Sequence, residues 1–157
     1  MKPYADTNFL CRLYLPLAES GAAARQLADA QAAASSPLPV TWLHRLETIN
    51  ALQLYVLTGA ARGQIRVTPE QAAAAHATFR ADLAQPAFLQ AAQLTTSDLE
   101  AQFEELALRH TARHGFRTYD LLHVASALLL KCDCFWSFDP KASKLAALEG
   151  LTTMVER

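Results

Sequence analysis

Short apolar segments alternate with longer helical segments along the whole chain, and this alternation limits the possible folds more than any other feature. Strands that alternate with helices are typical of a parallel sheet with helices on both faces. The strands are brief and apolar, as expected when both faces are covered. We therefore predict a three-layer α/β/α fold with a short, mainly parallel central sheet. The segments predicted as strands are residues 2–5, 37–40, 88–94, 132–138 and 151–155.

Start and stop signals divide the intervening sequence into helices. Residues 7–34 are predicted to be helical segments, followed by a helix over 42–57 and a helix that begins at residue 69. A separate helix is predicted from the capping box at residues 97–100 to residue 114, then one over 119–131 and a short one that begins at residue 140. The predicted N-caps are Thr41, Thr68, Thr118 and Asp139, with Pro69 and Pro140 at first helical positions and a capping box at residues 97–100. The predicted stops are Thr58-Gly59 and Gly115.

Length and charge fit one soluble domain. The chain has 157 residues, which we assign to a single domain over residues 1–157. Its net charge is −1, so any contact with nucleic acid must come from a local patch of positive charge. The N-terminus lacks the pattern of a signal peptide, and the longest apolar run, residues 124–130, is too short to span a bilayer. We expect a cytoplasmic protein with no membrane partner.

The cysteines do not suggest a disulfide framework. They are Cys11, Cys132 and Cys134, an odd number without paired spacing. Cys132 and Cys134 form a Cys-x-Cys sequence, but no second Cys or Cys/His pair completes a zinc site. We interpret the cysteines as small, buried apolar residues.

Two carboxylates directly follow predicted strands. Asp6 follows the first strand, and Asp139 follows the apolar strand that ends at Phe138. In an open parallel sheet, the carboxyl ends of the strands open onto the crevice where ligands bind. We therefore expect both side chains at this crevice. As an alternative, each also suits the N-cap of the helix that follows it.

Two further carboxylates lie on helices in apolar surroundings. On a helical wheel, Glu47 lies between Leu43 and Leu54 at the edge of the predicted core face, and Asn50 falls in the same stripe. Asp120 occupies the first turn of a helix that is apolar nearly all round and hence buried. The alternatives are a partly exposed edge position for Glu47 and a favourable first-turn charge for Asp120.

Four carboxylates in one cleft repel one another and are costly to desolvate, unless a cation binds between them. A hard divalent ion such as Mg²⁺ takes oxygen ligands and leaves room for a phosphate oxygen. If the four acids meet, metal-assisted hydrolysis of a phosphodiester is the chemistry that they favour.

The chain resembles the PIN-domain family, and more narrowly the VapC-type toxins of bacterial toxin–antitoxin pairs. The matching segments, in the order of the family, are Ala-Asp-Thr-Asn at 5–8, Leu-Glu-Thr-Ile-Asn-Ala at 46–51, Tyr-Asp-Leu-Leu-His-Val-Ala-Ser-Ala at 119–127 and Ser-Phe-Asp-Pro at 137–140. The resemblance spans nearly the whole chain. It implies an Mg²⁺-dependent endoribonuclease, with a cognate antitoxin and a second copy of the chain as partners.

The resemblance also implies roles for individual residues. The metal site for Mg²⁺ or Mn²⁺ would consist of Asp6, Glu47, Asp120 and Asp139. Thr7 would orient a metal-bound water or a neighbouring carboxylate, and Asn8 would support the same network. His123 matches a family position, but we interpret it as a hydrogen-bonded core histidine because a hard cation prefers oxygen ligands.

Several cations are placed where they can steer phosphates toward the acids. Arg117 lies three residues before Asp120, and Lys141 lies two residues after Asp139. The full set of candidates is Arg12, Arg45, Arg117, Lys141 and Lys144. Solvated surface charge is the alternative for each of them.

Two other functions stay open from the sequence. The first is a phosphohydrolase with Asp6 as the phosphorylated nucleophile. Enzymes of the haloacid-dehalogenase type, however, require a second Asp two residues after the nucleophile, and this chain has Asn8 there. The second is a catalytically inactive module that binds a partner peptide and no divalent ion.

Overall fold

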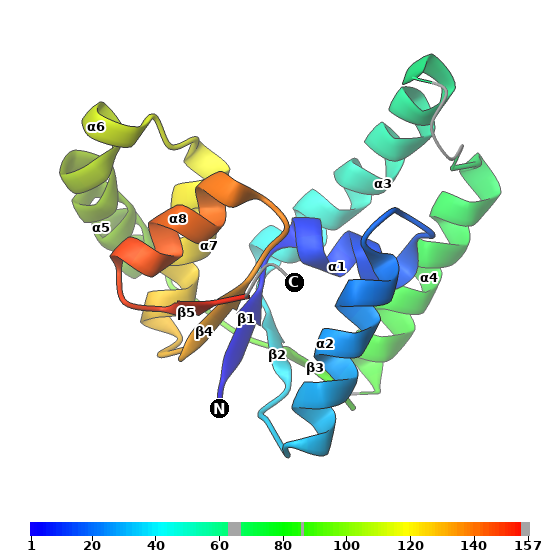
Figure 1. Cartoon of the computed structure of the whole chain (residues 1–157), viewed down its shortest axis with the longest axis horizontal. Coiled ribbons are helices and arrows are strands. Elements are labelled where there is room, and N and C mark those ends of the chain that lie inside the picture. The colour runs from blue at the N-terminus through cyan, green and yellow to red at the C-terminus, as the bar shows by residue number, and fades with distance from the viewer. Residues whose placement is uncertain (63–66, 86, 155–157) are drawn as a thin grey trace.

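The computed structural model describes residues 1–62, 67–85 and 87–154 of the chain (Figure 1). The described strands are β1 (Pro3–Ala5), β2 (Leu38–Val40), β3 (Leu89–Ala91), β4 (Cys134–Trp136) and β5 (Thr152–Thr153). The helices are α1 (Thr7–Tyr14), α2 (Ser20–Ala32), α3 (Trp42–Arg62), α4 (Pro69–Ala84), α5 (Thr96–Leu106), α6 (Ala112–His114), α7 (Thr118–Leu129) and α8 (Pro140–Leu148). A π-helical segment, Ala107–Thr111, joins α5 to α6.

The strands pair in parallel, in two short sheets. One sheet has three strands in the order β1-β4-β5, with Tyr4 opposite Phe135. The other joins β2 to β3, with Val40 opposite Ala91. The three-layer α/β fold with a short parallel sheet is thus confirmed, and the sheet proves to be divided into two parts.

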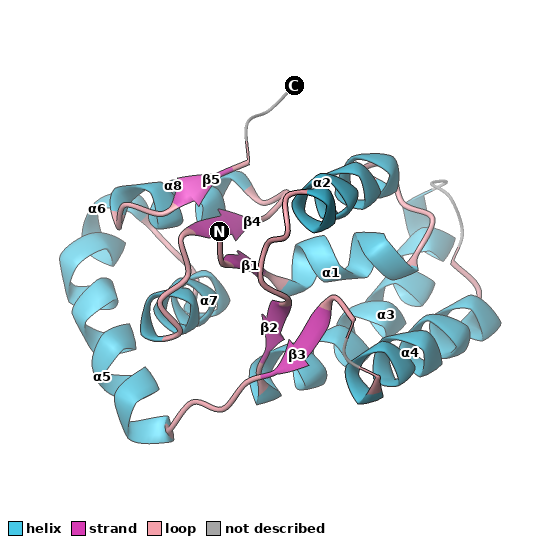
Figure 2. Cartoon of the chain, turned by 90° about the horizontal axis from the view of Figure 1, so that it is seen from below, coloured by secondary structure: helices cyan, strands magenta, loops and turns pink. Residues whose placement is uncertain are grey.

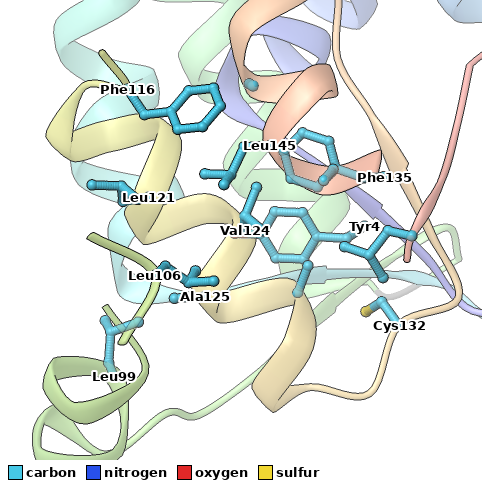
Figure 3. Close-up of a cluster of buried hydrophobic side chains, with 14 residues drawn as sticks. Tyr4, Leu99, Leu106, Phe116, Leu121, Val124, Ala125, Cys132, Phe135 and Leu145 are labelled. Atoms are coloured by element: carbon cyan, nitrogen blue, oxygen red, sulfur yellow. The ribbon is translucent and has the colours of Figure 1, made fainter. Parts of the chain in front are cut away.

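Helices cover both faces of the strands. Figure 2 shows the strands between α5 and α7 on one side and α1 to α4 on the other. Neighbouring strand residues point to opposite faces. Tyr4 and Phe135 pack against α7 and α8 in one buried cluster (Figure 3), whereas Ala5 and Trp136 pack with Phe9 of α1 in a second cluster. Burial of both faces explains why β1 and β4 are apolar throughout.

Each strand is shorter than predicted. The predicted strand over residues 132–138 contains only Cys134–Trp136 as strand, because the backbone N–H of Cys132 donates to Ala127 at the end of α7. The last predicted strand, 151–155, contains Thr152–Thr153, and its residue Val155 lies outside the described residues. The three cysteines are buried free thiols, as expected.

Two predicted helix starts are wrong, because other residues occupy the N-cap positions. Thr95 Oγ1 accepts the backbone N–H of Asp98 at 3.2 Å, so α5 begins before the expected capping box. Arg117, not Thr118, is the N-cap residue of α7. The predicted caps Thr68 and Asp139 are confirmed by bonds from the backbone N–H groups two or three residues on.

The predicted end of α3 at Thr58-Gly59 is also wrong, because the helix continues to Arg62. Thr58 Oγ1 donates to the carbonyl of Leu54 at 2.9 Å, a bond within the helix that satisfies the hydroxyl without ending it. Gly115 does end a helix, with φ of 67°, as predicted. The predicted helical region 7–34 is divided into α1 and α2.

The outer face of α3 is unexpectedly apolar. Leu43 is buried as predicted, but Leu54 is 48% exposed and Asn50 is exposed, so the predicted core stripe is wrong beyond the first turns. The large apolar side chains exposed on this helix are Trp42, Leu46, Ile49, Leu54 and Leu57. Within the described part of the chain, no helix has the length and apolarity needed to cross a membrane.

Candidate active site

A cavity of about 260 Å³ opens where β1 and β4 end and where α7 and α8 begin. We call it the acidic cavity, because the four carboxylates singled out in the sequence all line it. The lining residues are Asp6, Thr7, Asn8, Glu47, Arg117, Tyr119, Asp120, His123, Asp139 and Ala142. The structure thus brings the acids together from two strand ends and two helices.

Asp6, at the end of β1, is the most deeply buried of the four carboxylates. Its Oδ1 accepts the backbone N–H of Phe9 at 2.8 Å, which caps α1, and its Oδ2 accepts the hydroxyl of Ser137 at 2.6 Å. Burial raises the pKa of Asp6 to about 6, although the charge of His123 and these two hydrogen bonds offset part of the effect. Asp6 is therefore both a helix cap and part of the cavity wall.

Glu47 is held by two side chains on one of its oxygens. Thr7 Oγ1 donates to Glu47 Oε2 at 2.7 Å, and His123 Nε2 lies 2.5 Å from the same oxygen. Burial alone raises the pKa of Glu47, but the hydrogen bond and charge of His123 and the Thr7 hydroxyl lower it overall. The carboxylate is therefore kept ionised and fixed in place.

His123 is buried and both of its ring nitrogens have partners. An ionised carboxylate only accepts hydrogen bonds, so the proton facing Glu47 belongs to Nε2. Nδ1 lies 2.9 Å from the hydroxyl of Tyr4, within hydrogen-bond distance. This agrees with the expectation of a hydrogen-bonded core histidine.

A second buried histidine ties α3 to the strand that carries Asp6. His44 is fully buried, its Nδ1 accepts the backbone N–H of Thr41 at 3.1 Å, and its Nε2 donates to the carbonyl of Ala5 at 2.9 Å. Burial lowers the pKa of His44 to about 3, so the ring is neutral. His44 thereby sets the position of Asp6 relative to Glu47, one turn further along α3.

Arg117 lies between the other two acids. Its guanidinium contacts Asp120 at 3.3 Å and also pairs with Asp139, while its backbone N–H donates to Asp120 at 3.0 Å. Asp139 in turn accepts the backbone N–H of Lys141 at 2.8 Å. The side chain of Arg117 is 63% exposed, so these ion pairs are weak and easily exchanged for other partners.

The donor set fits a hard cation, although the arrangement is not a finished coordination shell. Within residues 1–62, 67–85 and 87–154, no three His, Cys, Asp or Glu side chains are grouped so that they could hold a metal ion. The cavity nevertheless offers carboxylate and hydroxyl oxygens, which Mg²⁺ prefers. Asp6 has no ion-pair partner among the described residues, and a cation would supply one.

The remaining candidates are spread around the cavity. Asn8 Oδ1 accepts the backbone N–H of Phe138 at 3.3 Å, so it supports the loop that carries Asp139. Arg12 lies away from the lining, where it pairs with Glu19 at 2.8 Å and stacks over Phe138. Arg45, Lys141 and Lys144 are exposed.

Three residues near the acids were not anticipated from the sequence. Ser137 binds Asp6, and its signal is a hydroxyl between two aromatic residues, Trp136 and Phe138. His44 lies one turn before Glu47 on the same helix. Tyr119 is 56% exposed at the cavity, although an aromatic residue next to Asp120 looked like part of the core.

Comparisons with known proteins agree with this geometry. A family model described as PIN domain matches residues 4–148. Among solved structures, the VapC20 toxin of Mycobacterium tuberculosis, described as cleaving the sarcin–ricin loop, superimposes with a TM-score of 0.59. It is 22% identical to this chain, and the match covers 90% of this chain and 93% of VapC20. A search of curated protein sequences finds no match.

Proposed function

Because the chain belongs to the PIN-domain family, we propose that it is an Mg²⁺- or Mn²⁺-dependent endoribonuclease and the toxin of a type II toxin–antitoxin pair. The observation that carries the proposal is the convergence of Asp6, Glu47, Asp120 and Asp139 on one cavity. The VapC20 toxin, whose fold this chain shares, acts on RNA, which supports the class of substrate.

The proposed metal ligands are the four carboxylates, and Thr7 and Asn8 support them. A divalent cation bound there would activate water and stabilise negative charge on the phosphate. Thr7 and His123 hold Glu47 in one orientation, and Ser137 does the same for Asp6. Fixed ligands reduce the reorganisation that accompanies the reaction.

Substrate contacts are proposed at the cavity mouth. Arg117 and Lys141 lie beside Asp139 and carry the positive charge that a phosphodiester requires. The exposed ring of Tyr119 suits stacking against an unpaired base. Arg12 is engaged with Glu19 in the structure, so any role in steering RNA would require it to leave that pair.

Protein partners are part of the same proposal. The family resemblance implies a cognate antitoxin and a homodimer, and the exposed apolar face of α3 supports an interface with protein. Light scattering of the purified chain, alone and with the product of a neighbouring small gene, tests both partners. A monomer that binds no such product would contradict them.

The decisive experiment compares Asp6→Asn and Asp120→Asn with the wild type. Both variants should lose cleavage of single-stranded RNA in Mg²⁺ or Mn²⁺ by at least about a hundredfold while retaining their circular dichroism. Asp29→Asn is the matched control, because Asp29 is exposed on α2. Wild-type turnover in either site variant would disprove the metal site.

Calorimetry separates the enzyme from a docking module. Titration with Mn²⁺ should release or absorb heat with the wild type and raise its melting temperature, because a ligand of the folded state stabilises it. Neither effect should occur with Asp120→Asn. The absence of both effects in the wild type would favour a module that binds only protein.

A further inference from the structure

A row of positive side chains leads away from the acidic cavity along α6 and α8. Lys141 and Lys144 are three residues apart on α8, so they share one side of that helix. Arg113 and His114 end α6, and Arg117 begins α7 at the cavity itself. Figure 1 shows α6, α8 and the start of α7 on the same side of the molecule. We call Arg113, His114, Lys141 and Lys144 the basic strip.

One contact joins the α8 part of the strip to the end of α6. Lys141 Nζ donates to the carbonyl of Gly115, directly after α6, at 3.3 Å. Burial and then the charges of Lys144, His110 and Arg113 lower the pKa of His114. Arg117 extends the row to Asp139 at the cavity.

The charge of the strip is available to a ligand. Arg113, Lys141 and Lys144 are exposed, and none of them takes part in an ion pair with the residues that the structure describes. Arg109 differs, because Glu105 and Glu149 offset its charge. Since the whole chain has a net charge of −1, the strip is a local feature of the surface.

We propose that the basic strip binds consecutive phosphates of a single-stranded RNA and leads that strand into the acidic cavity. The inference rests on the proposed nuclease function and adds the surface that holds the substrate. A strand on the strip reaches Arg117 next and then the exposed ring of Tyr119, which can stack a base. An acidic protein segment has charges but no bases to stack on Tyr119, so it fits less well.

Binding without cleavage gives the direct test. Fluorescence anisotropy with a labelled single-stranded RNA in EDTA should show that the double variant Arg113→Gln/Lys144→Gln binds roughly tenfold more weakly at low salt. Its plot of log K against log salt should be shallower by about 1.4, which is about 0.7 for each lost phosphate contact. The double variant Arg25→Gln/Arg80→Gln is the control, because it removes the same charge from exposed positions on α2 and α4. Equal affinities and slopes for the two double variants would overturn the proposal.

Competition and cleavage distinguish the remaining outcomes. Polyglutamate at equal charge concentration should displace the RNA poorly, and efficient displacement would overturn the choice of RNA as ligand.

In cleavage assays, the strip variant should raise the KM for a long RNA. If the wild type cleaves no RNA yet the strip variant loses binding, the strip is retained and the nuclease proposal fails. If the wild type cleaves RNA and the strip variant has an unchanged KM, the strip proposal fails alone.

Discussion

His123 Nε2 lies 2.5 Å from Glu47 Oε2, and this contact joins α7 to α3 beside the acidic cavity. The other ring nitrogen is hydrogen-bonded to the hydroxyl of Tyr4 at 2.9 Å, so the ring connects a strand of the sheet to the cavity wall. All three side chains are more than half buried. The geometry of the site therefore depends on residues that need not touch a substrate.

Replacing His123 tests this dependence. His123→Leu should lower the free energy of unfolding by about 2–3 kcal/mol, because it leaves the buried Tyr4 hydroxyl without its partner and removes one of the two hydrogen bonds to Glu47 Oε2. Urea unfolding at pH 7 measures the change. His76→Leu on α4 is the control, since His76 makes no side-chain hydrogen bond with the described residues, and it should change stability by less than about 0.5 kcal/mol. Equal effects of the two changes would show that the network is not stabilising.

Tyr119 should contribute to substrate binding and little to stability. Its side chain is 56% exposed, so Tyr119→Ala should leave the melting temperature nearly unchanged. The KM for single-stranded RNA should rise roughly tenfold, because stacking of a base on an aromatic ring contributes about 1–3 kcal/mol. Tyr119→Phe retains the ring and should retain the wild-type KM. A Phe variant as weak as the Ala variant would assign the role to the hydroxyl instead.

The free energy of unfolding should depend on pH through Glu149, which does not line the acidic cavity. Burial alone raises the pKa of Glu149, but hydrogen bonds and charge from His110 and Arg109 lower it overall. A depressed pKa stabilises the fold above the ordinary value of 4.5, and the stabilisation is lost as the pH falls through the lower folded value. Glu149→Gln should therefore lower the free energy of unfolding at pH 7, by an amount that shrinks toward pH 3. Glu100→Gln, on the exposed side of α5, should show no such trend in urea unfolding across this range.

Gly115 should be sensitive to a change that Gly21 tolerates. Gly115 has φ of +67°, so Gly115→Ala should destabilise the protein by about 1 kcal/mol, although a Cβ there would meet nothing within 4 Å. Gly21 lies in α2 with ordinary φ, and Gly21→Ala should be neutral or stabilising by up to about 1 kcal/mol. Thermal unfolding of both variants measures the difference. Destabilisation by Gly21→Ala alone would contradict the backbone argument.

Sequence patterns located the acids because their positions follow from local rules. Asp6 and Asp139 follow strands whose carboxyl ends must share one edge of a parallel sheet. Asp120 begins a helix whose apolar surface requires burial on all sides. These rules act within a few residues of each acid, so they are visible in the linear sequence.

The errors concern features that depend on distant parts of the chain. Thr58-Gly59 is a stop signal, yet α3 passes it while packed beside α4. His44 looked like an ordinary helical residue, because its partner, the carbonyl of Ala5, is 39 positions away. The exposed apolar face of α3 also breaks the periodic pattern on which the helical wheel relied. Contacts of this kind follow from the fold and have no signature in the local sequence.

The pairing of β1 with β4 also bears on how the protein is made. Asp6 and Ser137 meet across 131 residues, and Asp139 lies three residues after the end of β4. A nascent chain leaves the ribosome N-terminus first, so β1 is synthesised well before β4. Until β4 has been made, Asp6 lacks its contact with Ser137 and is not yet close to Asp139. No N-terminal fragment that ends before β4 can assemble the cavity. Whatever chemistry the cavity performs therefore begins only after β4 and the residues up to Asp139 have been synthesised.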